Sequence, residues 1–383
     1  MVDGFAGRGR YTSNPGAPTE DYEGSPLIML KSLIAFRDGR LKNVQFVFLF
    51  IELNEENYKF LYKEIHNFHD AMPSWPTNIQ ILVKSSPFED VTNNGIDEYV
   101  LKAPVGNTFR QATFLFVDPF EFKGFSMTLL SQICGEREGH TVELFLNFMS
   151  DYILRFTIEQ SQGQNLYQER YMAKLFGVTP DEWRKFRDNS NVQAEGLVEL
   201  FTDQLRKHVV FKYILSLEMK REDMSPIYYL VYATRHIKGL EKMKEAMWKC
   251  DQNLKAKSEP PEALLLEYFQ NNPGVESFKI EDINMFVLTK TPFPKSAGTD
   301  VLKELEKQKS IELYQSQRQG REYSSNSSFV FKGMPGMIPN EPATPKSGNQ
   351  RDPNATSSES VSSGKQTRID NYFKSNKSGY SLS

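Results

Sequence analysis

The stretch Val44–Ile51, VQFVFLFI, is a nearly continuous apolar run with the length of one β-strand. Such a run indicates a strand that is buried on both faces, as in the middle of a parallel sheet. Three further runs have the same character: Ile79–Val83 (IQILV), Thr113–Val117 (TFLFV) and Val142–Phe148 (VELFLNF). We expect all four runs to be strands of one sheet.

Helix-like segments separate these runs, at Pro26–Phe36, Glu55–Phe68 and Ser126–Ile133. Strands that alternate with helices predict an α/β fold with a doubly wound, Rossmann-like parallel sheet. A helical stretch is expected at about 165–207, and a further helix at Gly239–Lys249.

Two late strands are expected to pair antiparallel to each other. Val209–Leu217 and Tyr228–Thr234 flank the polar turn Lys220–Pro226, so they predict an antiparallel hairpin. Dinucleotide-binding sheets usually stay parallel, whereas the sheet of class I methyltransferases ends in such a pair. The hairpin therefore favours the methyltransferase type of sheet, and we assign residues 1–250 to this domain.

A second, smaller unit is expected at 258–332. Its pattern predicts three helices followed by two strands around a polar wing, which is typical of a winged-helix-like α+β domain. The helices are expected at Glu262–Gln270, Ile280–Thr289 and Ser296–Gln308, and the strands at Ile311–Gln317 and Ser328–Phe331. Residues 333–363 are rich in Pro, Gly, Ser, Asn and Thr, which predicts a disordered linker.

Composition limits the classes of function. The chain has 383 residues with 46 Lys and Arg against 49 Asp and Glu, a formal net charge of -3. This balance leaves only a local patch for electrostatic binding of nucleic acid. No run approaches the roughly 18 apolar residues of a membrane span. Two cysteines, Cys134 and Cys250, indicate a reducing compartment, and His66 and His69 lack a further ligand, so we predict no metal site.

A glycine-rich turn and a distant acid form the first candidate site. The turn is Asp3-Gly4-Phe5-Ala6-Gly7-Arg8-Gly9, and Glu52 ends the next expected strand. A carboxylate there can accept hydrogen bonds from both ribose hydroxyls of an adenosine. The wide spacing and the missing G-x-G-x-x-G pattern favour S-adenosylmethionine (SAM) over NAD. The alternative is a tight turn and a surface glutamate.

A second candidate site follows the strand Thr113–Val117. It consists of Asp118, Pro119 and Phe120, at the carboxyl end where ligands of such sheets bind. The carboxylate can accept a hydrogen bond from an exocyclic amino group, and the aromatic ring offers a stacking face for a flipped base. The alternative is that Asp-Pro merely begins a turn.

Several segments resemble one family in order and spacing, over roughly residues 1–332. They read DGFAGRGRY, GSPLIML, FLFIE, FLFVDPFEFKG, VELFLNFM, LFG…W and YYLVYATRHIKGLEKMKEAMW. These segments look like the three-Cys-motif partner (TcmP) family, which resembles class I SAM-dependent methyltransferases. The resemblance implies a partner protein that carries the three-Cys motif.

By this resemblance, Asp3, Phe5, Gly7 and Gly9 fall on the SAM-binding motif, and Glu52 on the ribose-binding acid. Asp118-Pro119-Phe120 falls where amino-methyltransferases of nucleic acids carry Asp-Pro-Pro-Tyr, with Phe120 in place of the second proline. Relatives carry a helix and most of a strand before the Asp-Gly-Phe. We therefore expect a truncated first strand: either the chain is a fragment or mis-started, or the sheet lacks its middle strand.

The tail carries a short motif within 364–377. Gln366, Ile369, Tyr372 and Phe373 form the pattern Q-x-x-I-x-x-[FY]-[FY], which resembles the PCNA-interacting (PIP) box that binds the DNA sliding clamp. One helical turn places the three apolar side chains on one face, as a plug for an apolar pocket. Such clamps belong to eukaryotes and archaea, so we expect a nuclear protein, or a cytoplasmic one in an archaeon.

Two hypotheses of function follow. The first is a SAM-dependent methyltransferase that acts on a nucleobase amino group of DNA or RNA and is recruited to the sliding clamp by its tail. The second is a catalytically inactive methyltransferase fold that serves as a clamp-binding adaptor. Asp118 separates them, because only an enzyme requires its carboxylate.

Overall fold

A computed structural model describes most of the chain. The described residues are 1–11, 22–36, 43–102, 111–120, 124–161, 166–189, 192–220, 226–250, 261–315, 318–319, 322–333 and 380–382. They form two compact units, Met1–Leu240 and Glu241–Leu382. The expected linker beyond residue 333 and the PIP-box-like motif at 364–377 lie outside the described residues.

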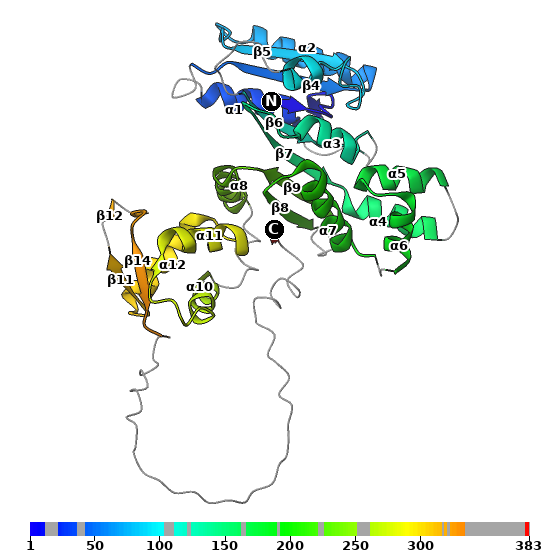
Figure 1. Cartoon of the computed structure of the whole chain (residues 1–383). Coiled ribbons are helices and arrows are strands. Elements are labelled where there is room, and N and C mark those ends of the chain that lie inside the picture. Colours follow the sequence, from blue (N-terminus) through cyan, green and yellow to red (C-terminus); the bar gives the residue numbers. More distant parts are fainter. Residues whose placement is uncertain are drawn as a thin grey trace, which may run out of the picture. The chain divides into compact units, whose positions relative to one another are not determined.

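The first unit is built on one sheet with the strand order β8-β9-β7-β6-β1-β4-β5 (Figure 1). The strands are β1 (Val2–Asp3), β4 (Phe46–Glu52), β5 (Ile79–Ser85), β6 (Gln111–Val117), β7 (His140–Phe148), β8 (Tyr213–Lys220) and β9 (Pro226–Thr234). Strands β5, β4, β1, β6 and β7 pair in parallel, and β9 is antiparallel to both β7 and β8. The expected α/β class, with a mostly parallel sheet, is confirmed.

The middle strand β1 is only two residues long. It is nevertheless paired on both sides, because Val2 lies opposite Leu49 of β4 and Leu115 of β6. The side chain of Val2 is buried in the core. The alternative of a sheet without its middle strand is therefore wrong, since β1 occupies that position.

Helices cover the sheet and extend the unit beyond it. They are α1 (Ser25–Phe36), α2 (Glu55–Asp70), α3 (Met127–Cys134), α4 (Ser150–Ser161), α5 (Leu166–Phe176), α6 (Pro180–Asn189) and α7 (Ala194–Gln204), with π-helical turns η1 (Asp97–Leu101) and η2 (Leu205–Val209). Helix α8 (Ile237–Cys250) begins in this unit and continues into the second unit, which starts at Glu241. Side-chain caps fix two starts: Asn54 accepts a hydrogen bond from Asn57 N, and Ser126 from Leu129 N.

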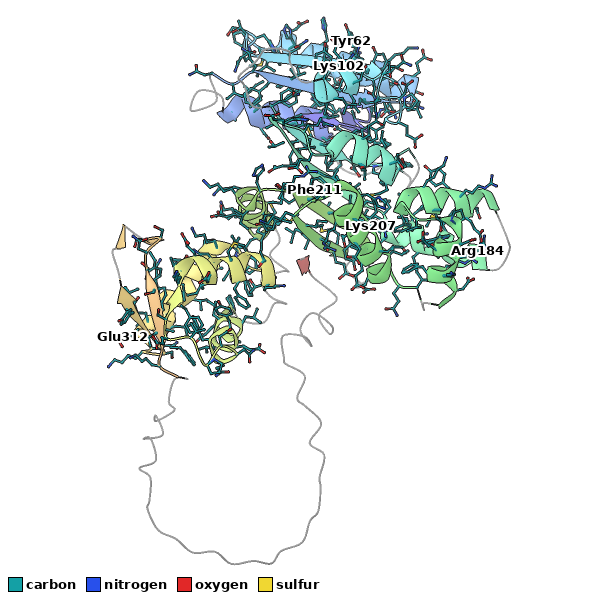
Figure 2. All side chains as sticks on the ribbon, viewed as in Figure 1. Tyr62, Lys102, Arg184, Lys207, Phe211 and Glu312 are labelled. Carbon is teal, nitrogen blue, oxygen red and sulfur yellow. The ribbon has the colours of Figure 1, made fainter. Side chains whose placement is uncertain are left out.

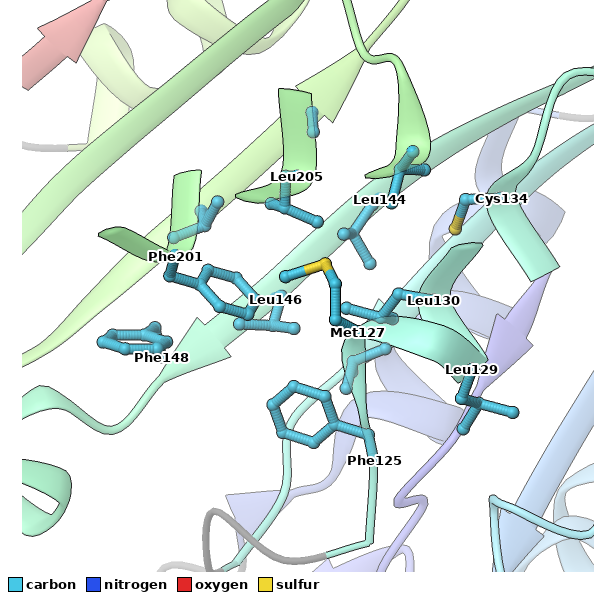
Figure 3. Packing of buried hydrophobic residues seen from close by; sticks show 14 of the residues in the cluster. Phe125, Met127, Leu129, Leu130, Cys134, Leu144, Leu146, Phe148, Phe201 and Leu205 are labelled. Atoms are coloured by element: carbon cyan, nitrogen blue, oxygen red, sulfur yellow. The ribbon is translucent and has the colours of Figure 1, made fainter. Parts of the chain in front are cut away.

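The main core of this unit lies between α3, β7 and α7 (Figure 3). Met127 of α3, Leu144 of β7 and Phe201 of α7 are each at most 1% exposed. The ring of Phe201 packs on that of Phe148, with centroids 4.8 Å apart. Burial of each such side chain contributes about 1.5 to 3 kcal/mol, so the shared core fixes α3 and α7 on the sheet.

The second unit has a core of its own. Helices α10 (Pro261–Gln270), α11 (Ile280–Lys290) and α12 (Lys295–Lys307) pack with a small antiparallel sheet, β10-β14-β11. Its strands are β10 (Phe278–Lys279), β11 (Ile311–Gln315) and β14 (Ser328–Phe331).

Short strands elsewhere complete the described secondary structure. They are the pair β12 (Arg318–Gln319) and β13 (Glu322–Tyr323), the pair β2 (Arg10–Tyr11) and β3 (Tyr22–Glu23), and β15 (Tyr380–Leu382). No helix in the described part of the chain has the length and apolar character needed to cross a membrane.

Candidate functional site at the carboxyl edge of the sheet

Three carboxylates gather at the carboxyl ends of the neighbouring strands β4, β1 and β6. Asp3 ends β1 and lies opposite Phe50 of β4 and Phe116 of β6. Glu52 and Asp118 each stand two positions beyond those partners, at the same edge. The crevice outside this edge is where open α/β sheets bind ligands.

The glycine-rich turn after β1 spans the three strands. Gly4 N donates to Phe116 O of β6 at 3.0 Å, and Ala6 N donates to Ile51 O of β4 at 2.9 Å. The backbone then turns at Gly7, whose φ is 65°, a conformation that favours glycine. The turn thus passes from the β6 side of β1 to the β4 side, directly over the strand ends.

Glu52 is held by two backbone amides. Its Oε2 accepts from Gly7 N and its Oε1 from Asn54 N, each at 2.8 Å. A carboxylate oxygen can accept two hydrogen bonds, so each oxygen keeps one free acceptor site in this arrangement. The half-buried carboxylate is therefore fixed in orientation and still able to receive a hydroxyl on either oxygen.

Asp3 differs from Glu52 in its role, because the side chain of Asp3 is fully buried. Its Oδ2 accepts from the Ser25 hydroxyl at 2.6 Å and its Oδ1 from Phe5 N at 3.2 Å. Burial raises the pKa of Asp3 from 3.8 to about 7, the charges of Asp118 and Glu52 add to this, and the two hydrogen bonds oppose it. Asp3 therefore fastens the turn to the start of α1, and its carboxylate is closed to solvent.

Two residues of the turn pack against protein. A Cβ on Gly9 would lie 3.0 Å from Leu61 Cδ1, so Gly9 allows the turn to approach α2 closely. The ring of Phe5 lies 5.4 Å from that of Phe88, and a Cβ on Gly124 would come within 3.0 Å of it. Phe5 and Gly9 thus shape the turn, and Gly7 is its glycine nearest Glu52.

The Asp-Pro-Phe segment presents its two ends to the outside. Asp118 is exposed, and its Oδ1 accepts from Nδ2 of Asn147 at 2.8 Å. Pro119 is buried, whereas the side chain of Phe120 is 95% exposed. Burial, with the charge of Asp118 as a further cause, raises the pKa of Tyr228. The segment therefore offers an oriented carboxylate beside an uncovered aromatic ring.

Sequence reasoning missed three residues that position these groups: Ser25, Asn54 and Asn147. Asn147 was visible as a polar residue near the end of the apolar run VELFLNF. Asn54 precedes a helix as a cap, which is also a local signal. Ser25 carries no local signal for its bond to Asp3, which is 22 positions away.

The structure gives no geometry for the predicted clamp-binding motif in the tail. Gln366, Ile369, Tyr372 and Phe373 lie outside the described residues. Within the described ranges, no three His, Cys, Asp or Glu side chains come together as a set of metal ligands.

Comparisons with known proteins find likeness among solved structures. No family model matches the chain, and no curated protein matches it. Among solved structures, a crystal structure of protein LPL1258 from Legionella pneumophila str. Philadelphia 1, of the family DUF519, is similar with 11% identity and a TM-score of 0.33. The match covers 61% of this chain and 75% of that chain.

Proposed function

We propose that this protein is a SAM-dependent methyltransferase that acts on a nucleobase amino group of DNA or RNA. The observation that carries the proposal is Glu52, held by the amide of Gly7 at the strand end next to β1. The sheet supports it, because its order ends in the antiparallel pair β8–β9 and so resembles the class I methyltransferase sheet. The sequence resemblance to the TcmP family points the same way.

The residues around Glu52 fit an adenosine. The free acceptor sites on its two oxygens suit the two ribose hydroxyls. The hydroxyl of Tyr11 lies at the position that a Cβ on Gly7 would take, so only glycine fits there. SAM, when bound, would supply an electrophilic methyl group. Glu52 and Gly7 would orient it, and Asp3 would hold the turn in place from below.

Asp118 and Phe120 suit the acceptor of the methyl group. The Asp118 carboxylate, oriented by Asn147, would accept a hydrogen bond from an exocyclic amino group and direct the nitrogen lone pair. The exposed ring of Phe120 would stack on the base, and Pro119 would hold the backbone between them. Catalysis would rest on proximity and placed charge.

The other modules complete the proposal. The helices α10–α12 and the strands β10, β11 and β14 support a winged-helix-like domain. Gln366, Ile369, Tyr372 and Phe373 would bind a PCNA-like sliding clamp, in the nucleus, and a three-Cys-motif protein would be a further partner. For the clamp, we expect Ile369→Ala with Phe373→Ala to abolish capture of the full chain on immobilised clamp.

A second candidate is a clamp-binding adaptor without turnover. The Asp118-Pro119-Phe120 segment favours it, because Phe120 replaces the second proline of Asp-Pro-Pro-Tyr and no tyrosine follows directly. In this case neither SAM nor Asp118 would matter for clamp binding.

Transfer of a tritiated methyl group from SAM to mixed DNA and RNA tests the proposal. The enzyme hypothesis predicts incorporation by the natural chain and a loss of about 100-fold or more for Asp118→Ala. Asp70→Ala, which removes an exposed acid on α2, is the matched control and should retain transfer. The adaptor hypothesis predicts no transfer by any variant and unchanged clamp binding by Asp118→Ala.

A further inference from the structure

A cleft of about 670 Å³ lies in the first unit, lined by α3, α5, the turn between α5 and α6, and the end of η2. Buried Met127 and Ala173 form an apolar floor. The polar lining consists of Thr128, Ser131, Arg170, Lys174, Thr179, Glu182 and His208. The cleft is thus mixed in character and contains none of the residues proposed above to bind SAM.

Two cations dominate its wall. Arg170 and Lys174 are four residues apart on α5, so they share one helix face, and both are exposed. Neither has a carboxylate partner among the described residues. The neighbouring buried acid Glu169 is bonded instead by Arg184 and Arg187 of α6, at 3.1 and 3.0 Å. The charges of Arg170 and Lys174 are therefore available to a ligand.

Glu182, the carboxylate in the lining, is hydrogen-bonded to Thr179 and lies near lysine side chains. Glu182 Oε2 accepts from Thr179 N at 2.7 Å and from Thr179 Oγ1 at 2.9 Å, as in a capping box. These hydrogen bonds lower the pKa of Glu182, and the charges of Lys207 and Lys185 lower it further. Figure 2 labels Lys207 on η2, close to α7. Two further cations thus lie close to the one lining carboxylate.

One hydrogen bond joins this cleft to the loop that carries Asp118. Gly124 N donates to the Tyr171 hydroxyl at 2.9 Å, and Tyr171 is the neighbour of Arg170 on α5. Gly124 follows Asp118 in the same β6–α3 connection, and the helix α3 that lines the cleft begins just after it. The helix α5, which lines the cleft, is therefore bonded to the connection that carries Asp118.

We propose that this cleft binds the phosphodiester backbone of a single nucleic-acid strand whose base is presented to Asp118. The inference rests on the proposed function, and it gives that function its missing electrostatic contact. A chain with net charge -3 needs a local basic site to hold a polyanion. A single strand is the expected form because a base must leave its stack before its amino group can be methylated.

Fluorescence anisotropy of the full chain with a fluorescein-labelled oligothymidine of about 15 nucleotides tests the proposal. We expect Arg170→Gln with Lys174→Gln to weaken binding about tenfold or more and to reduce the slope of log affinity against log salt by about 1.4. The matched control is Lys59→Gln with Lys63→Gln, which removes two exposed lysines at the same spacing on α2. It should bind as the natural chain does.

A charge-preserving exchange separates charge from folding. Arg170→Lys with Lys174→Arg keeps both charges and should restore binding to within about threefold. The proposal is overturned if the glutamine pair binds as tightly as the natural chain with the same salt slope. It is equally overturned if the α2 control loses as much affinity.

The proposed methyltransferase function is measured separately, by titration of SAM without nucleic acid. A chain that binds SAM but binds the oligonucleotide independently of Arg170 and Lys174 contradicts the cleft alone. A chain that binds the oligonucleotide through these residues but does not bind SAM contradicts the methyltransferase function alone.

Discussion

The amide of Gly7 donates to Oε2 of Glu52 across 2.8 Å, although 45 positions separate the two residues. This bond fastens the turn after the middle strand to the end of the next strand. The second oxygen of Glu52 accepts from Asn54 N, the cap of α2, so one carboxylate orders two loops. A single side chain thus links the shape of the turn to the group expected to bind a ribose.

Substitution Glu52→Gln keeps the size of the side chain and removes one acceptor. An amide nitrogen would then face either Gly7 N or Asn54 N, and one of these donors would lose its partner. We expect about 1 to 2 kcal/mol of destabilisation, measured by urea unfolding. Glu55→Gln, at an exposed position on α2, should leave stability nearly unchanged. Equal effects of the two substitutions would contradict the account of Glu52.

Gly9→Ala probes the close approach of the turn to α2. Gly9 has φ of 78°, and an added Cβ would lie 3.0 Å from Leu61 Cδ1. Gly139 has a similar φ of 71° but nothing within 4 Å of an added Cβ, so Gly139→Ala is the matched control. Both variants lose about 1 kcal/mol through the backbone, and Gly9→Ala should lose about 1 kcal/mol more. Thermal unfolding measures the difference, and identical losses would refute the steric contribution.

Asp3 should make stability fall as the pH rises. Its pKa is raised to about 7 in the folded chain, so between the ordinary value of 3.8 and about 7 the folded state holds a proton that the unfolded state has lost. The contribution is full below that window and is lost as the pH passes through it. Asp3→Asn has no such proton, so its stability relative to the natural chain should rise by about 1 to 3 kcal/mol between about pH 5 and pH 7.

Urea unfolding of both proteins at several pH values checks this prediction. Asn retains an oxygen that can accept from Ser25, so the hydrogen bond itself need not be lost. A difference between the two proteins that stays constant over the window would show that Asp3 is ionised in the folded state.

Lys244 is expected to hold the second unit together. Its fully buried Nζ donates to Val287 O, Leu288 O and Thr291 O at 2.9, 3.1 and 2.8 Å, at the end of α11. Lys244→Met keeps the length of the side chain but removes all three donors, so we expect a loss of about 2 to 4 kcal/mol. Lys249→Met, at an exposed position on the same helix, is the control and should be nearly neutral. Calorimetric unfolding distinguishes them, and similar midpoints would contradict the structural role of Lys244.

The sheet could be predicted because its strands are continuous apolar runs. Phe48, Leu49, Phe50 and Ile51 of β4 are each at most 1% exposed, and β6, which contains Thr113–Val117, pairs with β1 and β7 on its two sides. Continuous apolar runs of this length favour buried strands over helices. The sequence pattern does not locate β1 or α4. The two residues of β1 are too few to show a period. Helix α4 begins directly after the apolar run of β7, so no break in the pattern marks its start.

The sequence predicts where the acids of the candidate site lie, but not which residues surround them. Glu52 and Asp118 each follow an apolar run, so topology places them at one edge. Whether a carboxylate is open or buried depends on distant residues, and Asp3 is closed by Ser25 from the next helix. The cleft between α3 and α5 likewise arises from packing of separate helices, so no sequence pattern marked it.

Calorimetric titration of SAM into the full chain tests whether the edge formed by β4, β1 and β6 binds SAM. We expect binding in the micromolar range, and a loss of about tenfold or more in affinity for Glu52→Gln, which remains folded. Glu55→Gln should bind as the natural chain does. Absence of binding by a natural chain that unfolds cooperatively, or equal affinity for Glu52→Gln, would contradict the assignment of this edge of the sheet to SAM.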